Sequence, residues 1–140
     1  MSRIFWDTNL FIYLFEDYGA FSVSVKELRT KMLKRGDQLL TSTITLGEIL
    51  IKPMQAGDQQ LCRDYEKAIS SAATLVSFDL MAARHYASIK GDRSVRAPDA
   101  VQLSCAASAG VDLFVTNDDR LQNKQVRGIQ FIVPLNRVPI

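Results

Sequence analysis

Four acidic residues, Asp7, Glu48, Asp99 and Asp118, are each flanked by apolar residues, which is unusual for a carboxylate. They are far apart in the sequence, so only the fold can bring them together. A carboxylate that is removed from water costs free energy unless it is paired or binds a metal ion. If the four converge, their mutual repulsion raises their pKa values, and a divalent cation relieves that repulsion. A ligand set made only of oxygen atoms favours Mg²⁺ or Mn²⁺ over zinc.

Each of these acids also has a simpler structural explanation. Asp7 suits the N-cap of a helix, and Asp99 suits the first turn of another, where the helix dipole favours negative charge. Asp118 and Asp119 suit a turn. Glu48 is the hardest to explain in this way, because apolar residues surround it in the sequence. Together the four acids favour a site more strongly than any one of them does.

Other common chemistries find no support in the sequence. His85 is the only histidine and has no second histidine or cysteine at ligand spacing, which argues against a zinc site. The seven glycines form neither of the common nucleotide-binding loop motifs, and there is no Gly-x-Ser-x-Gly nucleophile motif. Cys62 and Cys105 are expected to be buried thiols in a reducing compartment, without a disulfide framework.

The composition is that of one globular domain, expected to span residues 1–140. Of the 140 residues, 47% are hydrophobic and 23% are charged, and the net charge of +2 is too small for a generic polyanion-binding protein. The longest apolar run, Leu10–Phe15, is far too short to cross a membrane. Asp7 interrupts any signal-peptide core. We therefore expect a cytoplasmic protein.

The hydrophobic pattern alternates between short apolar runs and helical periodicity. It predicts strands at 4–6, 38–41, 75–78, 113–116 and 129–133, and helices at 8–15, 22–35, about 45–51, 58–73, 79–89 and 98–109. The helix near 45–51 is expected to stop before Pro53, and Phe21 is expected to join Val25, Leu28 and Met32 in a buried stripe. This alternation predicts an α/β sandwich around a mostly parallel sheet, with ligands at the carboxyl ends of the strands.

The acidic residues lie in four segments that resemble, in order, the motifs of PIN-domain ribonucleases, and within them the VapC-type toxins of toxin–antitoxin pairs. The segments are Asp7-Thr8-Asn9, Thr45–Leu50, Pro98–Leu103 and Thr116–Leu121. Each motif alone is weak, but four in sequence over nearly the whole chain are fairly specific. The resemblance implies a PIN-like three-layer sandwich with a central, mostly parallel sheet flanked by helices.

The resemblance also implies an activity: cleavage of single-stranded regions of RNA with Mg²⁺ or Mn²⁺. By position, Asp7, Glu48, Asp99 and Asp118 would be the acidic quartet, acting both as metal ligands and in catalysis. Asn9 and Thr116 would orient the carboxylates or a water, and Asp119 would be a fifth acid or an alternative to Asp118. A metal held by such acids lowers the pKa of a water that then attacks the phosphate, so no protein nucleophile is needed.

An acidic pocket repels RNA, so basic residues at its rim must contact the phosphates. The candidates are Arg84, Arg93, Arg96, Arg120 and Lys52. The resemblance implies two protein partners: a small antitoxin that covers the acidic pocket, and a second copy of the chain, bound through the early helices. No membrane partner is expected.

Three alternatives to the toxin remain open: a PIN-like scaffold that binds RNA or protein without cutting, a stand-alone PIN nuclease in RNA processing, and a haloacid-dehalogenase-like phosphohydrolase. The last is disfavoured because it needs a second carboxylate where this chain has Asn9.

Overall fold

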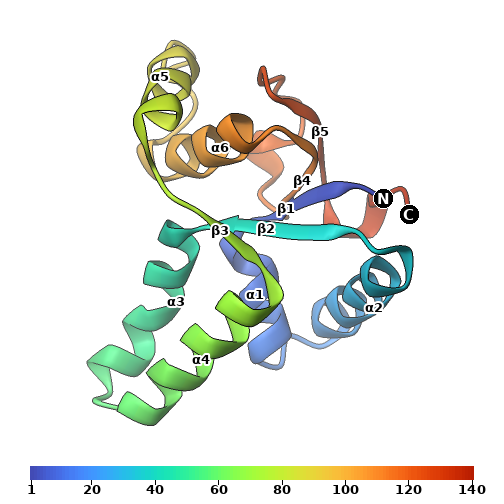
Figure 1. Ribbon diagram of the computed structural model, residues 1–140, viewed down its shortest axis with the longest axis vertical. Coiled ribbons are helices and arrows are strands. Elements are labelled where there is room, and N and C mark those ends of the chain that lie inside the picture. Colours follow the sequence, from blue (N-terminus) through green and yellow to red (C-terminus); the bar gives the residue numbers. More distant parts are fainter.

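The protein, described over residues 1–140 by a computed structural model, alternates strands and helices as the hydrophobic pattern predicts. All of its strands run parallel in one sheet, in the order β3-β2-β1-β4-β5 (Figure 1). The strands are β1 (Arg3–Trp6), β2 (Gln38–Ser42), β3 (Thr74–Val76), β4 (Val111–Val115) and β5 (Ile129–Val133). Because β1 and β4 lie at the centre, the residues that follow them meet at the middle of one edge of the sheet.

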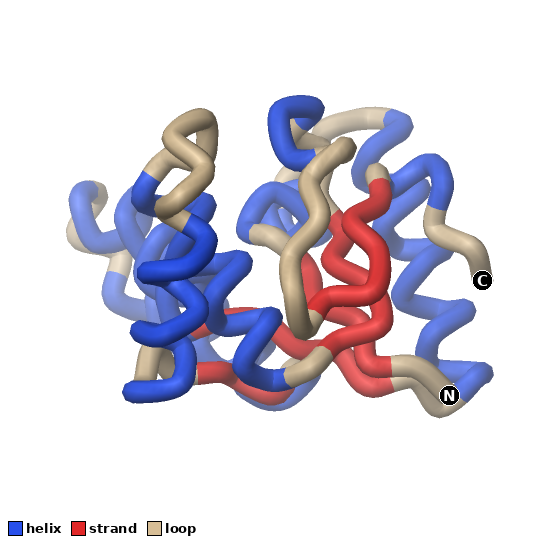
Figure 2. Tube along the Cα trace, turned by 90° about the horizontal axis from the view of Figure 1, so that it is seen from above, coloured by secondary structure: helices blue, strands red, loops and turns tan.

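Six α-helices cover the two faces of this sheet (Figures 1 and 2). They are α1 (Thr8–Phe15), α2 (Ala20–Arg35), α3 (Thr43–Gln55), α4 (Gln59–Ala72), α5 (Leu80–Ile89) and α6 (Ala97–Ala109). One hydrophobic cluster joins the sheet to α1, α2, α3 and α4, and a second joins it to α5 and α6. Two 3₁₀ turns, η1 (Asp119–Leu121) and η2 (Leu135–Arg137), follow β4 and β5.

The alternation of side chains along β1 assigns residues to the two layers. Ile4 and Trp6 belong to the cluster beneath α1 and α2, whereas Phe5 belongs to the cluster beneath α6. Phe5 pairs in register with Phe114 of β4, and the two rings stack with centroids 5.1 Å apart. A shift of one residue would exchange the two faces, so these buried side chains specify the register.

The predicted three-layer α/β sandwich is confirmed, and most element bounds agree within two or three residues. The expected end of the third helix is wrong. Helix α3 continues through Pro53 to Gln55, because a proline near the end of a helix removes only one late hydrogen bond. The ring of Pro53 is buried, which compensates for that bond.

Two expected burial assignments are also wrong. Val25, Leu28 and Met32 are buried as expected, but Phe21, in the first turn of α2, is 50% exposed and stacks on Tyr13 rather than joining the core cluster. Cys62 is only half-buried in α4, whereas Cys105 is fully buried in α6. Burial, with a smaller contribution from Asp79, raises the pKa of the Cys105 thiol to about 11, so this cysteine is protonated and unreactive at neutral pH.

Candidate active site

The four acids lie on elements that end or begin at the carboxyl edge of the sheet. Asp7 directly follows β1 and is the N-cap of α1, and Asp118 follows β4 and is the N-cap of η1. Asp99 lies in the first turn of α6, and Glu48 lies in α3, which begins directly after β2. The parallel topology thus gathers residues that are far apart in the sequence.

Asp7 is held by hydrogen bonds to both of its carboxylate oxygens. The backbone N–H of Thr8 donates to Oδ1 over 2.8 Å, and the hydroxyl of Thr116 donates to Oδ2 over 2.7 Å. Thr116 also accepts a bond from the N–H of Asp118 over 3.1 Å, so one buried hydroxyl links two of the acids. Burial raises the pKa of Asp7, and the negative charges of Glu48 and Asp118 add to this effect, against the hydrogen bonds.

The pKa of Asp99 is also affected by its acidic neighbours. Burial raises the pKa of Asp99, and the charges of Asp118 and Asp7 raise it further, whereas Arg96 opposes the shift. Two carboxylates in one region with raised pKa values form an electrostatic arrangement that is common at functional sites. The site therefore carries more negative charge than its surroundings neutralise.

Glu48 differs from the expectation of a buried acid. Of its apolar neighbours, Ile49 is buried and Leu46 packs against the core, but Ile44 and Ile51 are exposed, and so is Glu48 itself. The hydroxyl of Thr8 donates to its Oε1 over 3.0 Å, which holds the carboxylate beside the beginning of α1. Thr8 thus contacts two acids, Asp7 through its backbone and Glu48 through its side chain.

Arg120 lies against two of the acids rather than facing solvent at the rim alone. Its Nε donates to Oδ1 of Asp118 over 2.9 Å, and its Nη2 lies 3.8 Å from Oδ2 of Asp99. The guanidinium therefore supplies positive charge between these two carboxylates. As the side chains are placed here, no three His, Cys, Asp or Glu residues converge closely enough to hold one metal ion.

The donor set nevertheless fits a hard divalent cation in its chemistry. It consists only of carboxylates, without nitrogen or sulfur ligands, and burial together with the charges of the neighbouring acids raises the pKa values of two of them, Asp7 and Asp99. An ion at this position would have to take over the role of the Arg120 guanidinium between Asp99 and Asp118.

A buried polar network beneath the acids was missed by the sequence analysis. The Nε2 of Gln102 donates to the hydroxyls of Thr8 over 3.0 Å and Thr45 over 2.7 Å, and Ser42 donates to its Oε1. Thr41 extends the network from Thr45 to the Trp6 carbonyl. A glutamine in the otherwise apolar stretch Ala100–Leu103 was the available signal, although it did not identify the partners.

The two remaining auxiliary candidates lie in different surroundings. The Oδ1 atom of Asn9 is buried without a hydrogen-bond partner. Asp119 is exposed and is the first residue of η1, directly after Asp118.

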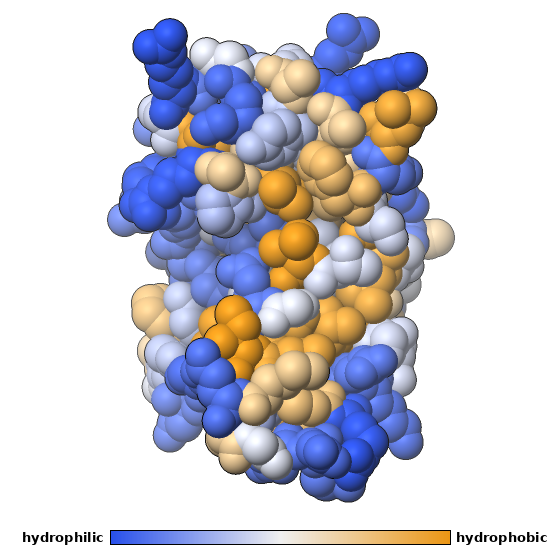
Figure 3. Space-filling model, turned by 90° about the vertical axis from the view of Figure 1, so that its left-hand side faces the viewer, coloured by the Kyte–Doolittle hydropathy of each residue, from blue (hydrophilic) through white to orange (hydrophobic).

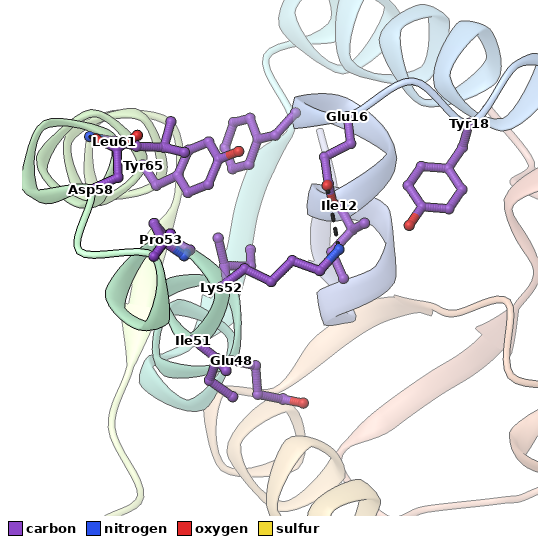
Figure 4. A pocket seen from close by; sticks show the side chains of 13 residues that line it. Ile12, Glu16, Tyr18, Glu48, Ile51, Lys52, Pro53, Asp58, Leu61 and Tyr65 are labelled. Carbon is purple, nitrogen blue, oxygen red and sulfur yellow. Dashed lines mark hydrogen bonds and ion pairs between the residues drawn. The ribbon is translucent and has the colours of Figure 1, made fainter.

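The basic candidates lie on several elements. Arg96 and Arg93 are exposed at the start of α6 and in the preceding loop, and Arg84 is exposed on α5. Lys52 extends from α3 across a groove to Glu16 at the end of α1, with a distance of 3.6 Å between the charged atoms (Figure 4). This ion pair places Lys52 at a different part of the surface from Arg93 and Arg96.

The groove that Lys52 crosses lies between α1, α3 and α4 and has a volume of about 370 Å³. Its wall is mainly apolar and includes Ile12, Leu61 and Tyr65 (Figure 4), together with Phe15. Glu48 also lines the groove and accepts a hydrogen bond from Thr8, next to Asp7. Phe15 stacks on Tyr65 with centroids 4.8 Å apart, which joins α1 to α4 behind the groove. An apolar groove therefore leads to the acidic edge.

With this fold and these acids in place, the sequence model of the PIN domain matches residues 4–126, and the chain belongs to the PIN domain family. PIN domains of the VapC type are nucleases as a class, and PIN nucleases generally use divalent metals. A search of curated proteins finds no match to this chain.

Solved structures of toxin–antitoxin complexes share the fold. VapBC2 from Rickettsia felis, bound to a promoter DNA fragment, matches with a TM-score of 0.75 and 13% identity over 94% of this chain and 98% of that chain. DNA-bound VapBC from Salmonella typhimurium matches with a TM-score of 0.73 and 20% identity over 96% and 99%. VapBC-5 from Mycobacterium tuberculosis, a member of the VapBC family of toxin–antitoxin systems, matches with a TM-score of 0.62 and 16% identity over 95% and 99%. The expected resemblance to PIN domains is confirmed.

None of the helices has the length and apolar character needed to cross a bilayer.

Proposed function

We propose that this chain is a metal-dependent endoribonuclease and the toxin of a type II toxin–antitoxin pair. The observation that carries the proposal is the gathering of Asp7, Asp99 and Asp118 at the carboxyl edge of the sheet, with Glu48 beside them. Their charges act on one another, because the pKa values of Asp7 and Asp99 are both raised in part by the other acids. Membership of the PIN domain family supports the same activity.

The residues of the chain would act by holding and orienting the acids. Thr116 and the N–H of Thr8 hold Asp7, and the side chain of Thr8 holds Glu48. A bound Mg²⁺ or Mn²⁺ would neutralise the carboxylates and the charge that develops on the phosphate, and would lower the pKa of the attacking water. Asp7, Glu48, Asp99 and Asp118 are the proposed ligands, with Asn9 and Asp119 as auxiliary polar groups.

Single-stranded RNA is the proposed substrate, and its phosphates would be contacted by exposed basic residues. Arg96 lies three residues before Asp99 and its charge acts on that carboxylate, and Arg93 lies in the loop just before it, so these are the arginines best placed to do so. Arg84 lies farther along α5, and Arg120 is already paired with Asp118 and Asp99. Lys52 is paired with Glu16 in the groove, which favours a role in partner binding rather than RNA binding.

An antitoxin-type protein is the proposed partner, and the groove between α1, α3 and α4 is its proposed binding site. The apolar wall suits an apolar segment of a partner, and Glu16, Glu48 and Asp58 along the groove suit basic residues in that segment. Such a segment would reach the acids at the Glu48 end. The complexes of R. felis and S. typhimurium are VapBC pairs, which supports a two-protein assembly here.

A homodimer is also proposed. The side of the molecule formed by α3, α4 and α5 carries a band of apolar surface (Figure 3). Its exposed apolar side chains include Ile44, Phe78, Leu80 and Met81. We propose this face for the interface in place of the early helices named from the sequence, because these residues lie on α3 and just before and at the beginning of α5.

A non-cleaving RNA- or protein-binding scaffold is the second candidate. It is favoured by two observations: Arg120 is paired with two of the acids, and no three His, Cys, Asp or Glu residues converge closely enough to hold a metal ion. A stand-alone PIN nuclease would share the site but not the antitoxin.

The test is cleavage of end-labelled single-stranded and structured RNAs in Mg²⁺, Mn²⁺ or EDTA. Asp99→Asn is the site variant, and Asp64→Asn, an exposed acid on α4, is the charge-matched control. Cleavage should require metal, vanish in Asp99→Asn and persist in Asp64→Asn. In parallel, Mn²⁺ should raise the Tm of the wild type but not that of Asp99→Asn. Equal cleavage by all three proteins would contradict the proposal, and an absent Mn²⁺ shift would favour the scaffold.

A further inference from the structure

A second hollow shares helix α1 as a wall with the apolar groove but is lined by different residues. Its volume is about 600 Å³, and it is bounded by α1, the start of α2, the turn after β4 and the segment after β5. Its lining includes Tyr13, Phe21, Asn117, Asp119 and Leu135. Asn117 and Asp119 flank Asp118 in the chain, so this hollow directly adjoins the acidic site.

Aromatic rings form one wall of the hollow. Phe21 stacks on Tyr13 with centroids 4.9 Å apart and an angle of 20° between the ring planes. Tyr13 in turn contacts Tyr18, with centroids 5.4 Å apart. Phe21 remains 50% exposed although Tyr13 stacks on it, so ring surface is available to a flat ligand in the hollow. An exposed aromatic stack of this kind is how proteins bind the bases of single-stranded nucleic acids.

The opposite wall supplies hydrogen-bonding groups. The Oδ1 of Asn117 accepts a bond from the N–H of Leu135 over 3.0 Å, which fixes the side chain and leaves its NH₂ group as a donor. Asp119 is exposed and offers carboxylate oxygens as acceptors. A carboxylate repels a phosphate but accepts N–H groups from the edge of a base. The chemistry of this wall therefore suits a base rather than the backbone of the strand.

We propose that this hollow, which we call the Phe21 hollow, binds one unstacked nucleobase of the RNA strand next to the proposed cleavage site. The base stacks on Phe21, Asp119 accepts its N–H groups, and the NH₂ of Asn117 donates to an acceptor on its edge. Guanine fits this arrangement best, because it presents two adjacent N–H donors that one carboxylate can accept together. The inference rests on the proposed ribonuclease function for its substrate class.

The test measures binding without cleavage. Fluorescein-labelled RNA decamers are titrated with protein in EDTA and followed by anisotropy, and each strand is compared with a strand of the same length in which all bases are absent. The wild type should bind the strand with bases more tightly. Phe21→Ala should lose roughly 5- to 100-fold in affinity for this strand and little for the abasic strand. Phe131→Ala, which removes a 63% exposed aromatic ring on the edge strand β5, is the control and should bind as the wild type.

A second comparison tests the polar wall. The wild type should prefer a decamer with one guanine in a uridine strand over the same decamer with adenine at that position. Asp119→Asn should reduce this preference, because the amide has only one acceptor oxygen in place of two.

The failure of this inference can be distinguished from the failure of the proposed function. Metal-dependent cleavage together with unchanged binding by Phe21→Ala would overturn the Phe21 hollow and leave the nuclease in place. Loss of base-dependent binding in Phe21→Ala without cleavage by any protein would support the hollow and contradict the nuclease. Equal binding of strands with and without bases by the wild type would overturn the hollow.

Discussion

The Nε2 atom of Gln102 lies within hydrogen-bond distance of two threonine hydroxyls, 3.0 Å from Oγ1 of Thr8 and 2.7 Å from Oγ1 of Thr45. All three residues are buried, and they come from α6, α1 and α3. Since Thr8 also donates to Glu48, the amide of Gln102 connects the three helices that carry Asp7, Glu48 and Asp99. One interior side chain thus fixes the relative positions of three of the acids.

Gln102→Leu should therefore destabilise the protein. The leucine fills a similar volume but leaves the hydroxyls of Thr8, Thr45 and Ser42 short of a buried partner, at a cost of about 2–4 kcal/mol in the free energy of unfolding. Urea unfolding followed by circular dichroism measures this. Gln60→Leu, at an exposed position of α4, is the matched control and should change stability by less than about 0.5 kcal/mol. Similar stabilities for the two variants would show that the network adds little.

Asp37 provides a prediction for the pH dependence of stability. Burial opposes its ionisation, but hydrogen bonds from Arg35 and the Ser2 amide, with the charges of Arg35 and the N-terminus, hold the pKa of Asp37 below its usual value. A lowered pKa stabilises the folded state above the unfolded-state pKa of about 4, and this contribution is lost as the pH falls toward the folded-state pKa.

Asp37→Asn should thus lower the free energy of unfolding at pH 7 by about 1–2 kcal/mol, and the difference from the wild type should shrink as the pH falls toward 3. Thermal unfolding between pH 3 and pH 7 measures both the stability difference at pH 7 and its decrease at lower pH. Asp17→Asn, an exposed acid near the end of α1, serves as the control. A constant difference at all pH values would contradict the assigned charge effect.

Arg120→Ala should strengthen the binding of Mn²⁺. The guanidinium bonds to Asp118 and lies near Asp99, so it competes with a cation for the same carboxylates. Because the arginine is 49% exposed and its charge is partly screened, we expect an increase in affinity of about three- to tenfold, measured by calorimetry. Arg127→Ala removes an exposed arginine elsewhere and should leave the affinity unchanged. Weaker binding by Arg120→Ala would show that this residue does not compete with the ion.

Arg96→Ala should weaken the binding of single-stranded RNA and reduce its dependence on salt. A phosphate contact releases counterions when it forms, so losing one contact lowers the slope of log K against log salt by about 0.7 for a single strand. Binding titrations at several salt concentrations measure this slope, and Arg63→Ala, on the exposed surface of α4, is the control. An unchanged slope would remove Arg96 from the RNA-binding surface.

The sheet and most helices were predictable because their signals are local. Short apolar runs indicate the strands β1 and β4. Asp58 and Asp79 indicate the starts of α4 and α5, where their side chains accept hydrogen bonds as N-cap residues do. The end of α3 at Pro53 was predicted wrongly because the free-energy cost of a proline depends on its position in the helix. The burial of Phe21 was predicted wrongly because helical spacing identifies a face of the helix but not which residues of that face the neighbouring elements cover.

The acids of the candidate site were identifiable, whereas their surroundings were not. Asp7, Glu48, Asp99 and Asp118 have recognisable neighbours in the sequence, but the pairing of Arg120 with Asp118 and Asp99 depends on side-chain placement in three dimensions. The bond from Thr116 to Asp7 spans 109 residues. Gln102 was overlooked because its partners lie 94 and 57 residues away, on other elements. Contacts of this range follow from the topology and not from any local pattern.

Tyr13 of α1 and Tyr18, in the segment that follows α1, connect the apolar groove to the Phe21 hollow. Tyr18 lines the groove and contacts Tyr13, which stacks on Phe21. This row of rings gives the two proposed sites a direct physical connection. Whatever factor a groove ligand applies to the affinity for a base, the base must apply the same factor to the affinity for that ligand. Titrating the protein with RNA in the presence and absence of the groove ligand measures this factor, which is the coupling between partner and substrate.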